Sequence, residues 1–159
     1  MKFFAALMVL ALLASIGGVT YLYLDATVTV EATGVAVVEA HAQPDLFADI
    51  KSQVRNNAVV GTVFRQEALA NAEDYQFCVY TVRLANKTFV TADMIEVQVT
   101  PIDGDILQIG ETGAHALSAR STGDIQATTL SRRGTQSMRE VTVTYYMWGI
   151  PFSVKTTCR

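Results

Sequence analysis

The chain has 159 residues, half of them apolar, and a net charge of -3 at pH 7. Acidic and basic residues are interspersed, so there is no basic stripe of the kind that binds nucleic acid, and we expect no nucleic-acid partner. Beyond an apolar N-terminal segment, about 135 residues remain, which is the size of one ordinary domain.

Residues 3–24 form a nearly unbroken apolar run, with Lys2 on its N-terminal side. A helix of about 22 residues spans about 33 Å, which is enough to cross a hydrocarbon core of about 30 Å. We therefore predict that residues 1–25 are an uncleaved signal-anchor and that residues 3–24 contact the lipid bilayer. By the positive-inside rule Lys2 stays in the cytoplasm, and the C-terminal domain lies outside it.

The alternative for this segment is a cleaved secretory signal, which would leave a secreted protein. Ser15-Ile16-Gly17 provides the small residues of a cleavage site. Apolar residues resume after Gly18, however, whereas the apolar part of a signal peptide usually stops within about 15 residues. This pattern favours the anchor.

Residues 26–57 are predicted to form a strand and a helix that extend the main domain. Residues 27–31 alternate polar and apolar, and residues 35–38 continue the pattern after Gly34, which we expect to mark a bulge or turn in one long or broken strand. In residues 44–54, Phe47, Ile50 and Val54 recur at helical spacing behind Pro44, which predicts a short amphipathic helix.

Residues 58–159 are predicted to form the core of a β domain, with two strands particularly well marked. Cys78, Tyr80, Val82 and Leu84 share one face of the strand at 77–84, and Ile95, Val97 and Val99 share one face of the strand at 94–100. Further strands are predicted at 59–64, 106–109, 124–130, 140–148 and 151–158. Residues 67–74 are expected to form a polar connection, 101–105 a turn and 110–123 a loop.

The last two strands read as a hairpin around Gly149-Ile150, because glycine suits the first position of a type II′ turn. That turn places Trp148 opposite Pro151, Met147 opposite Phe152, Tyr145 opposite Val154 and Val141 opposite Cys158. A slip of one residue would put Lys155 or Ser153 into the apolar row, so pattern and turn agree on this register.

Seven or so short strands with almost no helix predict an all-β fold, a β-sandwich of immunoglobulin or fibronectin type III character. In this topology the strand that carries Cys78 begins at the end of the sandwich where the last strand finishes. The immunoglobulin spacing of two cysteines around a tryptophan is absent, so the similarity extends to fold class only.

Cys78 and Cys158 are the only cysteines, and both are predicted to point into the core. An even count in an exported domain favours a disulfide between them. Closing a loop of about 80 residues would stabilise the fold by about 4 kcal/mol in the chain-entropy model. The alternative is two buried free thiols.

No motif in the sequence indicates a reactive centre. His41 and His115 lack acidic or cysteine neighbours at ligand spacing, and Asp103-Gly104-Asp105 reads as a turn rather than a calcium loop. Asn86-Lys87-Thr88 matches the N-glycosylation pattern. We predict no catalytic residue, no metal site and no cofactor, and hence that the protein is not an enzyme.

Tyr146 and Trp148 are predicted to face outward beside each other, on the side of their strand opposite the core. An exposed aromatic pair can stack on a sugar or anchor a protein partner. The alternative is that the N-terminal strand and the helix at 44–54 cover this face.

These features predict an exported, membrane-anchored binding or structural protein of the cell envelope. One alternative is a subunit of a larger membrane or pilus-like assembly, packed through the small residues of its N-terminal helix, such as Ala14, Gly17 and Gly18. Another is a secreted module that binds a sugar or a protein after signal cleavage.

Overall fold

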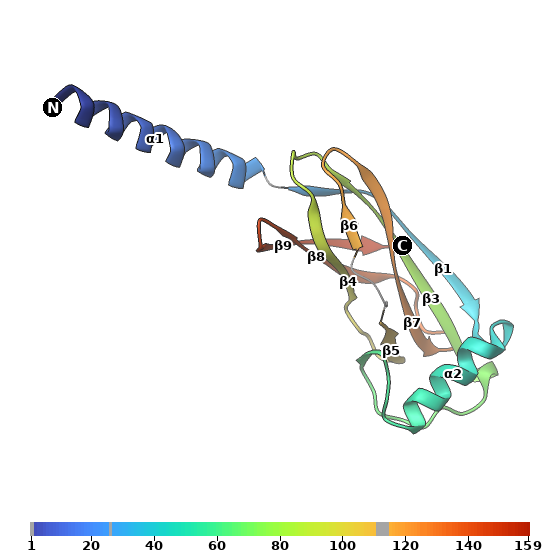
Figure 1. Ribbon diagram of the computed structural model, residues 1–159. Coiled ribbons are helices and arrows are strands. Elements are labelled where there is room, and N and C mark those ends of the chain that lie inside the picture. The colour runs from blue at the N-terminus through green and yellow to red at the C-terminus, as the bar shows by residue number, and fades with distance from the viewer. Residues whose placement is uncertain (1, 26, 111–114) are drawn as a thin grey trace.

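The computed structural model describes residues 2–25, 27–110 and 115–159. A long N-terminal helix, α1 (Lys2–Asp25), leads into two antiparallel sheets, and a second helix, α2 (Pro44–Arg55), packs at the far end (Figure 1). The predicted all-β body and the N-terminal apolar helix are both confirmed at this level.

Helix α1 has the properties of a membrane span. Its segment Phe3–Tyr21 has a mean hydropathy of 2.2, and none of it is buried against the rest of the protein. A signal sequence shares these properties. In Figure 1 the helix projects from one end of the sheets.

The two sheets are built from nine strands among the described residues. The five-stranded sheet has the order β1-β3-β7-β5-β2, and the four-stranded sheet has the order β6-β4-β8-β9. The first comprises β1 (Val28–Glu39), β3 (Tyr75–Asn86), β7 (Thr122–Arg132), β5 (Asp105–Ile109) and β2 (Gly61–Val63). The second comprises β6 (His115–Leu117), β4 (Ala92–Val99), β8 (Arg139–Met147) and β9 (Ile150–Cys158). Short 3-10 turns at Ala40–Ala42 and Ala72–Asp74 complete the elements.

The main core fills the space between the sheets, and its residues follow the predicted alternation. Tyr80, Val82 and Leu84 of β3 are buried, whereas Arg83 is exposed. Ile95, Val97 and Val99 of β4 face the same core. The two sheets therefore share one core, which confirms the β-sandwich.

A second apolar cluster lies under α2. Phe47 and Ile50 are buried there with Tyr75, Phe77 and Leu130, and the rings of Phe47 and Tyr75 lie 5.6 Å apart. The amphipathic helix predicted at 44–54 is thus confirmed, and it closes the end of the sandwich opposite α1 (Figure 1).

The closing hairpin exists, but its predicted register is wrong by two residues. Met147 pairs with Ile150, Tyr145 with Phe152, and Arg139 with Cys158. The turn is Trp148-Gly149, with φ of 53° and 77°, so both central residues are left-handed as in a type I′ turn. A shift of two residues preserves which face each side chain takes, so Val141, Val143, Tyr145 and Met147 are still buried.

The disulfide predicted between Cys78 and Cys158 is also wrong, because both cysteines are buried free thiols. Their inward direction is confirmed, since both belong to the main core. The true register places Cys158 beside Arg139 rather than Val141, and the sulfur of Cys78 accepts a hydrogen bond from Gln76 at 3.7 Å. The two thiols therefore have different neighbours in the core.

Three smaller expectations have mixed outcomes. The single long strand expected over residues 27–38 is confirmed, because β1 is continuous through Gly34, but the bulge falls between Val30 and Ala32. The loop predicted at 110–123 contains β6, while its residues 111–114 lie outside the described part of the chain. Asn86 is buried and its amide nitrogen donates to the carbonyl oxygens of Val90, Leu117 and Ser118, so it is not available for glycosylation.

Candidate binding groove

Helix α2 is held in place by local sequence signals. Pro44 occupies the first turn, where its missing N–H costs no hydrogen bond, and Asp45 complements the helix dipole. Asn57, with φ of 51°, turns the chain after the helix end. The helix therefore presents one face to the second core cluster and leaves its flank free to form a wall.

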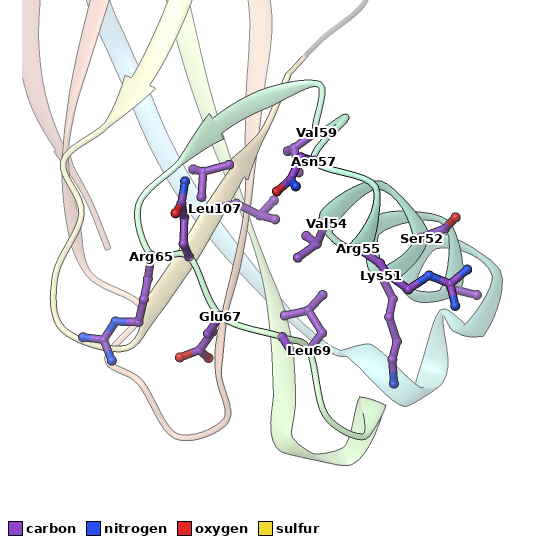
Figure 2. Close-up of a pocket in the computed structure, with 14 residues that line it drawn as sticks. Lys51, Ser52, Val54, Arg55, Asn57, Val59, Arg65, Glu67, Leu69 and Leu107 are labelled. Atoms are coloured by element: carbon purple, nitrogen blue, oxygen red, sulfur yellow. The ribbon is translucent and has the colours of Figure 1, made fainter.

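A groove of about 790 Å³ lies between that flank of α2 and the segment at 65–69. Val54, Val59, Leu69 and Leu107 form its apolar floor, and Figure 2 shows Val54 and Leu69 turned toward the hollow from opposite sides. The volume lies within the range of about 300–1,000 Å³ that is typical of binding sites. A mostly apolar floor is also typical of ligand pockets.

Polar contacts line the rim of the groove. The Nζ of Lys51 donates to the Ala70 carbonyl oxygen at 2.6 Å, which links α2 to the facing segment. Arg65 pairs with Asp103 at 2.5 Å, and Glu67 accepts from Arg132 at 2.7 Å. Arg65 and Glu67 are thus paired with opposite charges, whereas Lys51 bonds a neutral carbonyl oxygen and keeps its positive charge at the rim, which Arg55 also lines.

The groove was missed by the sequence prediction of a plain polar connection at 67–74. One signal was present, because Leu69 is the one large apolar residue in that stretch and is buried. The hollow itself depends on how far α2 stands from this segment, which no local pattern encodes.

A second group of polar side chains is buried at the end of the main core. Arg139 of β8 and Asp105 of β5 form a two-point ion pair across the sheets, at 3.0 Å (Nε–Oδ2) and 2.8 Å (Nη2–Oδ1). Both side chains are fully buried. Ser131 donates to Asp105 at 2.6 Å, and the Ile102 N–H donates to it at 2.9 Å.

This pairing decides the charge state of both groups. Burial alone would raise the pKa of Asp105, but the hydrogen bonds from Arg139, Ile102 and Ser131 outweigh it, and the pKa lies below its ordinary value. Burial likewise opposes the charge of Arg139, but Asp105 raises its pKa overall. None of these side chains lines the groove. We interpret the pair as a clamp between the two sheets.

The clamp was not predicted, although the sequence pattern indicates that one of its two residues, Arg139, faces the core. Arg139 has the same parity in its strand as the buried Val141 and Val143, which places it on the inner face. Asp105 sits in the predicted turn at 101–105, where nothing distinguishes it from the exposed Asp103.

The predicted aromatic surface lies at the other end of the domain from the groove. Trp148 is exposed at the tip of the hairpin, and Tyr146 is half-buried on β8. Strand β1 pairs with β3, and α2 packs at the opposite end, so the alternative in which these two segments cover the aromatic pair is not what the fold does.

Neither histidine lines the groove. His41 is exposed and pairs with Glu39 at 3.1 Å, and His115 lies half-buried in β6. Within the described residues, no group of three or more His, Cys, Asp or Glu side chains is placed to hold a metal ion.

No protein-family model matches the chain, and no curated protein matches it. The chain has low similarity to two solved structures, among others. A FixG-related protein from Vibrio parahaemolyticus is 10% identical, with 80% of this chain and 95% of that chain covered and a TM-score of 0.35. The cupredoxin domain of amoB from Nitrosocaldus yellowstonii is 9% identical, with 82% and 84% covered and a TM-score of 0.36. At such low identities and TM-scores, these similarities assign the chain to no family.

Proposed function

We propose that this chain is an exported, membrane-anchored binding protein of the cell envelope without catalytic activity. The observation that carries the proposal is the placement of α1 and the groove at opposite ends of the sandwich (Figure 1). A bilayer around α1 leaves the groove at the end of the domain farthest from the membrane, where a partner can reach it. We further propose that its sandwich has an immunoglobulin or fibronectin type III topology.

Export in this orientation is supported by the ends of α1. Lys2 precedes the apolar segment, and positive charge favours the cytoplasmic side. The aromatic residues Tyr21 and Tyr23 stand at the other end, where amphipathic rings suit the bilayer interface. The sandwich follows on that outer side.

The floor of the groove favours an apolar side chain of a protein partner over a sugar. Sugars stack on exposed aromatic rings, and the residues that line the groove in the described chain are aliphatic or polar. The edge strand β2 forms part of the same wall through the exposed Val63. A partner segment can therefore contact both the floor and the sheet edge.

The test compares two exposed valines on the two edge strands of the five-stranded sheet. Val63 of β2 is 41% exposed in the groove, and Val37 of β1 is 48% exposed away from it. The full chain would be expressed in its membrane, solubilised in mild detergent, and photo-crosslinked from a reactive residue at Ala48 on the groove wall.

We expect a discrete crosslinked species that persists in Val37→Glu and is lost in Val63→Glu. Equal crosslinking in both variants would contradict the groove as a binding site. The alternative of an assembly subunit gives a different result, because a large complex would then form through α1 and would survive both substitutions.

A further inference from the structure

The end of the sandwich that meets α1 is fixed closely to the helix. Only residues 26 and 27 separate α1 from β1. The Tyr23 ring lies 5.6 Å from Phe152, and Phe152 stacks on Tyr145 at 5.7 Å. The Val28 N–H donates to the Tyr145 hydroxyl at 3.0 Å. These contacts place this end of the domain directly against the end of the helix.

Three large apolar side chains are exposed at this same end. Phe89 is 70% exposed in the β3–β4 connection, and Trp148 and Ile150 are 49% and 41% exposed at the β8–β9 turn. Val28 pairs with Asn86 and Asp93 pairs with Tyr146, so both connections lie beside the start of β1 (Figure 1). We call Phe89, Trp148 and Ile150 the proximal rim.

The backbone around the rim is braced, so the exposure is built into the fold. The buried Thr88 donates to the Asn86 side-chain oxygen at 2.7 Å, and the Arg120 N–H donates to the Thr88 carbonyl oxygen at 3.1 Å. The Arg120 guanidinium lies 4.1 Å from the centre of the Phe89 ring. Phe89 is therefore held outward by an ordered connection.

Trp148 is exposed at a conformational cost. A bulky residue at φ of 53° is strained, and glycine or asparagine is the ordinary choice at this position of a type I′ turn. A backbone outlier that presents the only tryptophan of the chain to the outside points to a role for that side chain.

The depth of the rim matches the bilayer interface. Tyr23 lies two residues beyond Tyr21, the end of the apolar segment, and two residues of helix rise about 3 Å. The headgroup region of one leaflet is about 5–7 Å thick. Phe152, which contacts Tyr23, and the neighbouring turn at Trp148 therefore stand at the level of the headgroups.

We propose that the proximal rim inserts into the headgroup layer of the bilayer that α1 spans. This inference rests on the membrane anchoring proposed above and adds a second contact to it. Tryptophan favours this layer because its ring is apolar and its N–H can still reach a polar partner. The exposed Lys87 and Arg120 beside the rim can contact lipid phosphates. Two contacts would fix the tilt of the sandwich and aim the groove away from the membrane.

The single tryptophan makes a direct test possible. The full chain would be reconstituted into phosphatidylcholine liposomes that contain lipids with a spin-label quencher, either at the headgroup or near the end of the acyl chain. We expect the headgroup label to lower Trp148 emission at least about twofold and the deep label to quench it less. Aqueous acrylamide should quench it less in liposomes than after unfolding.

Variants test whether quenching depends on the rim residues themselves or on any exposed apolar residue of the domain. Phe89→Ser with Ile150→Ser should weaken headgroup quenching, whereas Leu46→Ser, at an exposed apolar residue on α2, should leave it unchanged. Equal effects of the two changes would overturn the inference.

Alkaline extraction of the same liposomes distinguishes the two proposals. If the chain resists extraction but neither lipid label quenches Trp148, the rim contact is overturned and the membrane anchor is still supported. Emission that is shielded from acrylamide but insensitive to lipid labels indicates contact with protein, such as a second copy, and also overturns it. Chain that is released by alkali overturns the anchor and the rim contact together.

Discussion

Substitution of Arg139 by methionine tests the buried clamp most sharply, because it leaves the Asp105 carboxylate fully buried without its cation. Removing one partner of a buried ion pair destabilises a protein by about 3–5 kcal/mol. With a urea dependence of about 2 kcal/mol per M, a loss of about 4 kcal/mol lowers the unfolding midpoint by about 2 M. The substitution also frees the carbonyl oxygens of Gln136 and Met138, which Arg139 now satisfies.

The assay is urea unfolding of the full chain in mild detergent, followed by the circular dichroism of the strands. Arg83→Met is the matched control, because Arg83 also makes a two-point contact, with Asp124 at 2.7 and 2.8 Å, but both side chains are substantially exposed. We expect the control to shift the midpoint little, because exposed pairs contribute little to stability.

A double variant, Arg139→Met with Asp105→Leu, should recover much of the loss, because replacing a whole buried pair by apolar residues is often neutral. The reasoning is refuted if Arg139→Met costs no more than Arg83→Met, or if the double variant loses the sum of the two single changes.

Three further outcomes follow from the same structure. Because folding lowers the pKa of Asp105, its contribution to stability is complete above the ordinary value of about 4 and is lost as pH falls below it. Asp105→Asn should therefore flatten the acid side of a stability–pH curve relative to the wild type, and an unchanged curve would contradict this. Burial raises the pKa of both thiols, Cys78 and Cys158, so a maleimide should label them only after unfolding, and rapid labelling of the native chain would count against their burial. Phe47→Ala should lower the free energy of unfolding by about 3–5 kcal/mol in urea titration, with Leu46→Ala as the exposed control; equal effects would show that α2 does not pack as described.

The elements that the sequence predicted correctly are those whose side-chain period agrees with their burial. Tyr80, Val82 and Leu84 alternate with exposed or half-buried neighbours, and Phe47 and Ile50 recur at helical spacing. In these segments local pattern and tertiary packing require the same conformation, so the pattern alone was sufficient.

The failures occur where tertiary structure overrides a local preference. Gly149 was predicted to lead the hairpin turn because glycine tolerates positive φ, yet Trp148 takes that position and Gly149 follows. That shift moved Cys158 from Val141 to Arg139 but kept its side chain in the core, so the register error does not explain why the predicted disulfide failed. The groove depends on the separation of α2 from a segment without regular structure, which sequence period does not describe.

The central claim is that α1 crosses the bilayer and holds the groove on its outer side. A cysteine introduced at the exposed Ala48 tests it directly, because the two native thiols are buried and should not react with a maleimide in the folded chain. A membrane-impermeant maleimide would be applied to sealed right-side-out and inverted membrane vesicles that contain the full chain. The account requires labelling of Ala48→Cys in right-side-out vesicles and protection in inverted ones. Labelling only in inverted vesicles, or recovery of the chain in the soluble fraction, would contradict it.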